Sequence, residues 1–171
     1  MMNFSEIIKV DAKANKIKPK ALMYFRNDIW AFIYSLRFLE CNSFRLSPIY
    51  IYHRIRFRTL SKKLSFSIPL NTCGPGLYLP HYGTIVINKN ARIGSNCTIQ
   101  TGVVIGMHPR DKMSVPTIGD NCYIGPGVKI YGKVQIAKNC AIGANAVVNR
   151  SFLRNGRVIA GVPAREVGLN G

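Results

Sequence analysis

The residues best suited to proton transfer near neutral pH are three histidines, because an unperturbed imidazole has a pKa of about 6.5. They are His53, His81 and His108. His81 lies in the segment Gly76–Thr84, six residues before Ile87, and so falls in phase with a column of aliphatic residues described below. An imidazole where an aliphatic side chain would otherwise recur indicates a functional role. His53, within a basic helical stretch, is expected to pack or to face solvent.

The cysteines indicate structure rather than chemistry. There are five, an odd number, and no two are spaced as a CxxC pair, so neither a disulfide framework nor a zinc knuckle is expected. Cys97, Cys122 and Cys140 share one register of the repeat, and Cys73 falls in phase with them. Free cysteine behaves there as a small buried hydrophobe. Cys41 lies in the helical part and is uninformative.

The elements that must position the histidines follow a six-residue repeat. An aliphatic residue recurs at every sixth position in two runs, namely Ile87, Ile93, Ile99 and Ile105, and then Ile118, Ile124, Ile130, Ile136, Ile142 and Val148. A second register of small or aliphatic residues lies two positions earlier, on the same face because strand side chains alternate. Six residues then form one flat side of a triangular coil, and about 18 residues form a full turn. A single turn cannot bury its apolar side chains, which are covered only when successive turns stack.

Two regions depart from this repeat. Thirteen residues separate Ile105 from Ile118, and residues 107–117 are polar and contain proline, which predicts a loop ejected from the coil. The stretches Lys20–Asn42 and Ser47–Lys63 lack glycine and have helical character. They predict a helical cap over one end of the coil, with a basic amphipathic surface that rests on an anionic membrane as a second interpretation.

These observations divide the chain into three parts. Residues 1–70 form an N-terminal helical region, residues 71–167 form the coil domain, and residues 168–171 form a tail. The fold class is mainly β, a parallel β-helix of hexapeptide repeats with an N-terminal α-helical cap.

The charge of the chain predicts a polyanionic partner. The 24 Lys and Arg residues against 7 Asp and Glu leave a net charge of +17. The excess is +9 over residues 1–70 and +8 over residues 71–171, so no isolated basic arm indicates nucleic-acid binding. No secretory signal peptide is visible, and the most apolar window, Ile29–Phe38, is too short and too charged to span a bilayer. A cytoplasmic protein is therefore expected.

Three segments together resemble a known family. They are GLYLPHYGTIVINKNARIGSNCTIQTGVVIG, then PTIGDNCYIGPGVKI after the loop, and IAGVPAREV near the C-terminus. Their order resembles the serine acetyltransferase-like branch of the hexapeptide acyltransferases, over roughly residues 70–167. Within that branch they look most like the O-acetyltransferases of capsule, colanic acid and exopolysaccharide pathways. The resemblance implies a left-handed coil, a handedness that the spacing itself does not reveal.

The resemblance also implies a site. His81 would be the general base that takes a proton from an acceptor hydroxyl, which attacks acetyl-CoA directly without an acyl-enzyme. A backbone N–H near Gly106 would meet the oxyanion. Small residues would let the pantetheine chain of the coenzyme approach the coil; the candidates are Gly125, Gly143, Ala144 and Ala160. Basic residues would bind the phosphates of the coenzyme; the candidates are Arg165 and Lys138. The family assembles as a trimer, so a homotrimer is expected.

Two departures from serine acetyltransferases bear on the acceptor. Those enzymes carry Asp immediately before the base, where this chain has Pro80, and an Arg-His pair where it has Ser114 and Val115. A saccharide acceptor is therefore predicted, with serine or another small hydroxy compound as the alternative. His108 would be a second polar contact to the acceptor. Asp11 resembles in position an acceptor-binding Asp of the family.

Two other classes of function remain open as minor alternatives. The same coil occurs in zinc-dependent carbonic anhydrases, but these need three converging histidines, and only His81 and His108 lie in the coil half. No metal is therefore expected. A non-catalytic coil that binds nucleic acid or membrane has only the charge in its favour, because no repeated aromatic-and-basic platform is present.

Overall fold

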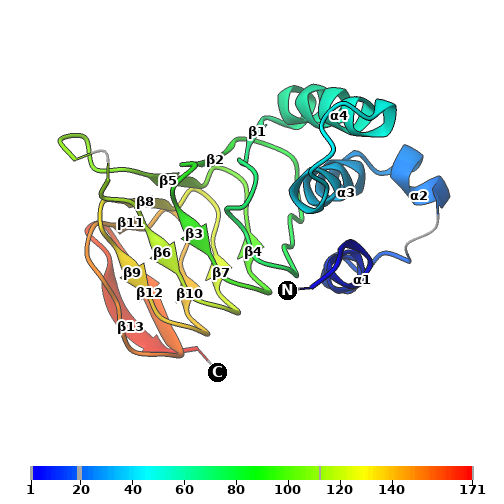
Figure 1. Cartoon of the computed structure of the whole chain (residues 1–171). Coiled ribbons are helices and arrows are strands. Elements are labelled where there is room, and N and C mark those ends of the chain that lie inside the picture. Colours follow the sequence, from blue (N-terminus) through cyan, green and yellow to red (C-terminus); the bar gives the residue numbers. More distant parts are fainter. Residues whose placement is uncertain (1, 19–20, 112, 171) are drawn as a thin grey trace.

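The repeat region forms a triangular prism of three sheets (Figure 1) in the computed structural model, which describes residues 2–18, 21–111 and 113–170. The first sheet contains β1 (Phe66–Ser67), β2 (Ile85–Ile87), β5 (Val104–Gly106), β8 (Lys129–Tyr131) and β11 (Val147–Val148). The second contains β3 (Arg92–Ile93), β6 (Thr117–Ile118) and β9 (Gln135–Ile136). The third contains β4 (Thr98–Ile99), β7 (Tyr123–Ile124), β10 (Ala141–Ile142), β12 (Arg157–Ala160) and β13 (Arg165–Leu169).

Stacking in register builds the core of this prism. The strands pair in parallel, apart from the antiparallel pair β12–β13, and partners such as Ile87 and Ile105 are 18 residues apart. Ile124 and Ile142 repeat that spacing on another face. The aliphatic columns are buried, and three of the predicted cysteines, Cys97, Cys122 and Cys140, are free and buried beside them. The predicted β-helix with a helical cap is thus confirmed, and its coil is left-handed.

Asparagines turn one corner of the prism. Asn96, Asn121 and Asn139 all have φ between 55° and 59°, the left-handed region that asparagine tolerates better than most residues. Each Nδ2 donates to the Oδ1 of the next asparagine, at 3.2 Å and 3.0 Å. The ladder therefore stabilises the same turn in three successive coils.

The first coil is two residues longer than the repeat, which overturns the predicted phase of its residues. Eight residues lead from Tyr78 to Val86, whereas six lead from their partners Thr98 to Val104. The extra residues lie in the corner that contains His81. That side chain is exposed, so the prediction that it lies in the aliphatic column was wrong.

Because of the same two-residue insertion, Cys73 occupies a different register of the repeat from the predicted one. It pairs with Ile93 and so belongs to the aliphatic column, rather than to the register of the other cysteines as predicted. It is nevertheless buried and free, as expected of a small hydrophobe.

The ejected loop lies at a second corner. Ile93 pairs with Ile118 and Ile105 with Ile130, 25 residues apart instead of 18, so the chain inserts seven residues after β5. Ile105 and Ile118 therefore occupy consecutive faces of the coil. The insertion projects from the prism, in yellow-green in Figure 1, and leaves the stacking of both neighbours unbroken.

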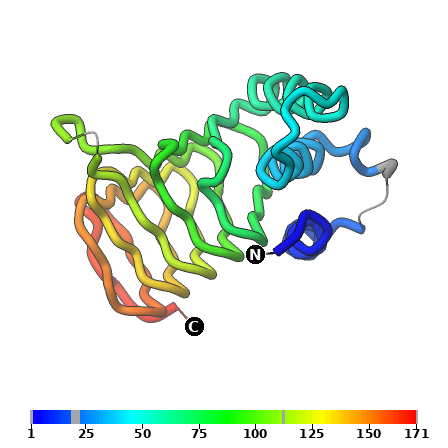
Figure 2. The backbone as a smooth tube through the Cα atoms, viewed as in Figure 1, coloured from blue at the N-terminus to red at the C-terminus, as the bar shows by residue number. Residues whose placement is uncertain are grey.

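Four helices cover the end of the prism where the first coil lies (Figures 1 and 2). They are α1 (Phe4–Ala14), α2 (Ala21–Arg26), α3 (Asp28–Cys41) and α4 (Pro48–Leu64). The predicted helix over Lys20–Asn42 is two helices, because the Asn27 side chain accepts from the Trp30 N–H and caps α3. Within the described residues, no helix has both the length and the apolar character needed to cross a membrane.

The strands also extend past the predicted limits of the coil. Strand β1 begins at Phe66, before residue 71, and pairs with β2. At the other end, β13 continues to Leu169 and pairs with β12. Residues 168–170, which the sequence assigns to a tail, thus pack on the end of the prism.

One buried ion pair joins the helices to the first coil. The Arg37 Nε donates to Asp11 Oδ2 at 2.8 Å, and both side chains are almost fully buried. Asp11 Oδ1 accepts from the Gly76 and Leu77 N–H groups, while Arg37 donates to the carbonyls of Cys73 and Gly74. Burial alone would lower the pKa of Arg37, but the carboxylates of Asp11 and Glu40 outweigh it and raise that pKa.

We predict that Asp11→Ala destabilises the protein by about 3–5 kcal/mol, because it removes one of the two carboxylates that pair with the buried Arg37 and leaves the Gly76 and Leu77 N–H groups without their acceptor. The free energy of unfolding is measured by denaturant titration. Lys9→Ala, on the exposed side of the same helix, should cost less than about 0.5 kcal/mol. A loss below about 1 kcal/mol for Asp11→Ala would show that the ion pair does not hold the helices to the coil.

Candidate active site

His81 stands at an exposed corner of the prism, between the third sheet and the first. Its corner is held from both sides. The Gly83 N–H donates to the Leu64 carbonyl at the end of α4 at 3.0 Å, and a Cβ at Gly83 would collide with the Thr101 hydroxyl in the next coil. With φ at 133°, Gly83 fits this turn where other residues would be strained. The imidazole is therefore presented on a fixed backbone.

A stripe of small residues lies along this same corner from the third coil onward, after Gln100 in the second coil. Gly125 donates to the Ile142 carbonyl, and Gly143 donates to the Ile159 carbonyl, so Gly125, Gly143 and Ala160 follow one another down the stack. Ala144 lies beside the stripe and is exposed. The coil itself also requires these small residues, because a Cβ on Gly125 would lie 2.6 Å from the Ile142 oxygen.

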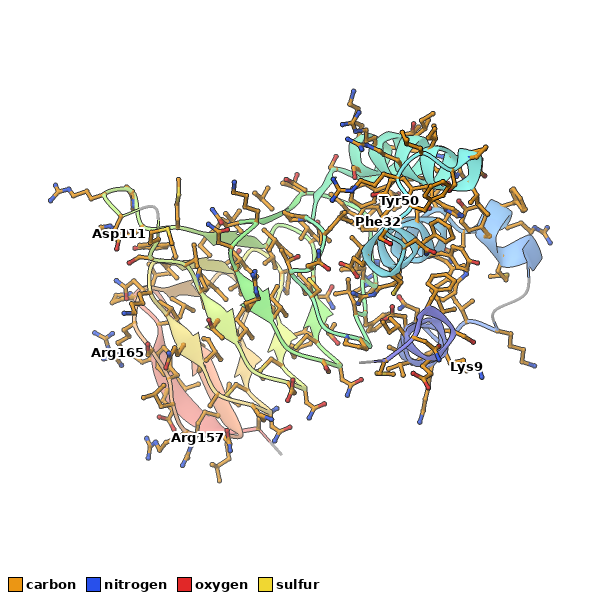
Figure 3. The ribbon with its side chains drawn as sticks, in the orientation of Figure 1. Lys9, Phe32, Tyr50, Asp111, Arg157 and Arg165 are labelled. Atoms are coloured by element: carbon orange, nitrogen blue, oxygen red, sulfur yellow. The ribbon has the colours of Figure 1, made fainter. Side chains whose placement is uncertain are left out.

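Arg165 closes the stripe at the far end of the prism. It pairs with Ala160 across β12 and β13, and its side chain is exposed (Figure 3). The other predicted phosphate-binding cation, Lys138, lies at the asparagine corner and forms an ion pair with Asp120 at 2.8 Å. The structure therefore aligns Arg165 with the stripe and places Lys138 on a different edge.

Gly106 and His108 lie at the loop corner, away from the corner of His81 within one chain. A Cβ on Gly106 would meet nothing within 4 Å. Gly106 lines a cleft of about 320 Å³ with Met107, Lys129 and other residues. Nδ1 of the exposed His108 ring accepts a hydrogen bond from the Arg110 N–H. The other ring nitrogen, Nε2, takes no part in this bond.

The structure removes Asp11 from any acceptor site. Its side chain is 0 % exposed, and both of its oxygens are occupied by Arg37 and by two backbone N–H groups. An acceptor could reach this carboxylate only by breaking the link between the helices and the coil.

Lys129 is a residue at the His81 corner that sequence reasoning missed. Its ammonium donates to the carbonyls of Gly102 and Gly127, at 2.5 Å and 2.9 Å. Both glycines have positive φ, so the lysine fastens two successive turns of the corner. The only signal in the sequence is a single lysine between Val128 and Ile130.

Among the described residues, no group of three His, Cys, Asp or Glu side chains is placed to hold a metal ion. The site is built instead from an imidazole, small residues and backbone groups.

Comparison with known proteins identifies the repeat. Residues 116–150 match the family model "Bacterial transferase hexapeptide (six repeats)", and residues 84–107 match "Hexapeptide repeat of succinyl-transferase". A serine acetyltransferase from Synechococcus elongatus is 33% identical over 99 residues, which are 57% of this chain and 40% of that protein. The chain thus spans less than half the length of this curated relative.

Solved structures share the fold beyond the repeat. A serine acetyltransferase from Brucella abortus in complex with coenzyme A has a TM-score of 0.67 at 24% identity, over 98% of this chain and 69% of that one. The serine acetyltransferase from Neisseria gonorrhoeae in complex with serine has a TM-score of 0.68 at 24% identity, over 96% and 69%. The alignments therefore include the helices as well as the prism.

These relatives correct the predicted acceptor. The sequence analysis favoured a polysaccharide O-acetyltransferase with a saccharide acceptor, but the relatives are serine acetyltransferases, so that prediction was wrong and its alternative is the better supported one. The capsule and exopolysaccharide branch finds no support among them. Residues 84–107 and 116–150 thus match hexapeptide repeats, and over 99 residues the chain is similar to a serine acetyltransferase.

Proposed function

We propose that this protein is an acetyl-CoA-dependent O-acetyltransferase whose acceptor is serine or a similarly small hydroxy compound. The observation that carries the proposal is one corner of the prism, which the exposed His81 shares with the stripe of Gly125, Gly143 and Ala160. The homology to serine acetyltransferases supports both the reaction and the acceptor class.

His81 would act as the general base in a direct transfer. Its imidazole takes the proton of the acceptor hydroxyl while the oxygen attacks the carbonyl carbon of the thioester. The tetrahedral intermediate then collapses with cleavage of the carbon–sulfur bond. The imidazolium returns the proton to the departing thiolate, so that the products are the O-acetyl ester and coenzyme A.

The stripe would receive the coenzyme. Small residues at Gly125, Gly143 and Ala160 allow an extended pantetheine chain to approach the backbone. Arg165, aligned with the stripe, would meet phosphate as a charge-assisted donor. The Brucella abortus protein with the same fold is a complex with coenzyme A, which supports this class of co-substrate.

A homotrimer would complete the site. Gly106 and His108 lie at a different corner from His81 in one chain, so they could reach its imidazole only from a neighbouring copy. The proposed trimer is a closed three-fold ring in which the loop corner of each chain would face the His81 corner of the next. Gly106 would then be available for the oxyanion and His108 for the acceptor.

We predict that His81→Ala lowers kcat/KM for transfer from acetyl-CoA to L-serine by at least ~100-fold, because it removes the proposed general base. Thiol release from acetyl-CoA measures the rate. The KM for acetyl-CoA should change little, since the stripe is untouched.

Gln135→Ala is the matched control, because it removes an exposed side chain from β9 of the second sheet, away from the His81 corner. Its rate should equal that of the wild type. Transfer by His81→Ala within about threefold of the wild type would refute the assignment of the base.

A second prediction concerns the acceptor carboxylate. Because Ser114 and Val115 stand where serine acetyltransferases have Arg-His, we expect kcat/KM for L-serine and for L-serine amide to agree within about tenfold. A charge-assisted hydrogen bond to the carboxylate would contribute about 1.5–3 kcal/mol, or roughly 10- to 150-fold. A preference for L-serine above ~100-fold would show that another cation binds the carboxylate.

A further inference from the structure

Six large apolar side chains are exposed together at the tip of the helical cap. They belong to the α3–α4 connection and to the first two turns of α4, with exposed fractions from 46% to 82%, and we call them the α4 apolar patch: Phe44, Leu46, Ile49, Ile51, Tyr52 and Ile55. Soluble proteins seldom leave so many neighbouring apolar side chains in water unless something covers them.

Helix α4 has one face in the protein and another that faces outward. Tyr50, His53, Leu60 and Leu64 are buried, and the His53 ring stacks on Phe38 of α3. Residues advance by about 100° along a helix, so Ile55 lies on the side opposite these buried residues. Figures 1 and 2 show α4 along the upper edge of the cap, with its first turn directed away from the prism.

Cations surround the patch without acidic neighbours in the sequence. No Asp or Glu occurs between Glu40 and Asp111, a stretch that holds nine Lys and Arg residues. Arg45, Arg54 and Arg58 are exposed beside or just beyond the apolar residues. The surface thus combines aliphatic side chains that avoid water with guanidinium groups that bind phosphate.

We propose that the α4 apolar patch docks this protein onto the surface of an anionic lipid bilayer. The aliphatic side chains enter the boundary between headgroups and acyl chains, and the arginines contact the lipid phosphates. Each such cation is worth about a fivefold gain in affinity near an anionic surface. The proposal does not depend on the acetyltransferase activity.

Other occupants fit these residues less well. A second copy would bring Arg54 and Arg58 of one patch against the same residues of the other, with no carboxylate from residues 41–110 to compensate. A nucleic acid would leave the aliphatic residues uncovered, because bases stack on aromatic rings rather than on isoleucine. A bilayer offers partners to both kinds of side chain.

The test is sedimentation of the full chain with vesicles of phosphatidylcholine alone or with about 30% phosphatidylglycerol, which gives the vesicle a negative surface potential. Binding to the anionic vesicles should be at least ~10-fold stronger. Ile55→Glu and Arg58→Glu should each weaken it by at least ~10-fold and leave acetyl transfer unchanged, which shows that both variants fold.

Two matched controls carry the same changes elsewhere on the surface. Leu153→Glu alters an exposed leucine of the coil and Lys133→Glu an exposed cation, and both should bind vesicles like the wild type. Equal binding to the two kinds of vesicle, or equal loss in the controls, overturns the proposal. So does self-association in solution that Ile55→Glu abolishes without any vesicle binding, which would assign the patch to a second copy.

Discussion

The structure depends on the stacking of like residues in successive coils. Each inward side chain rests on the equivalent residue of the next coil, as Ile124 rests against Ile142, and the core is continuous only while this register holds. An extra residue within a strand would turn every following side chain to the opposite face. Additional residues are therefore tolerated only at the corners, where the chain can leave the prism and return.

The candidate active site follows from that constraint. The coil has a two-residue insertion in the corner of His81 and a seven-residue insertion after β5, and both leave the flanking strands in register. Each insertion presents polar groups on a rigid scaffold, which is where loops most often carry function. The stripe of Gly125 and Gly143 needs no insertion, because close stacking already requires small residues there.

The helical cap covers the open end of the coil. The first coil has neighbours on one side only, so its backbone groups and apolar residues need another cover. Asp11 and Arg37 satisfy four backbone groups of that coil and neutralise each other within the interior. An ion pair with so many hydrogen bonds fixes the position of α1 and α3, which leaves α4 as the outer surface.

The sequence by itself determined the repeat, the prism and the helical cap, because each follows from local spacing and residue type. Only the tertiary structure decided that His81 is exposed, that Cys73 lies in the aliphatic column and that Asp11 is buried. The six-residue spacing does not predict which corner of the coil contains inserted residues. That choice is made when one coil stacks on the next, and the burial of Asp11 depends on Arg37, which lies 26 positions away in the chain.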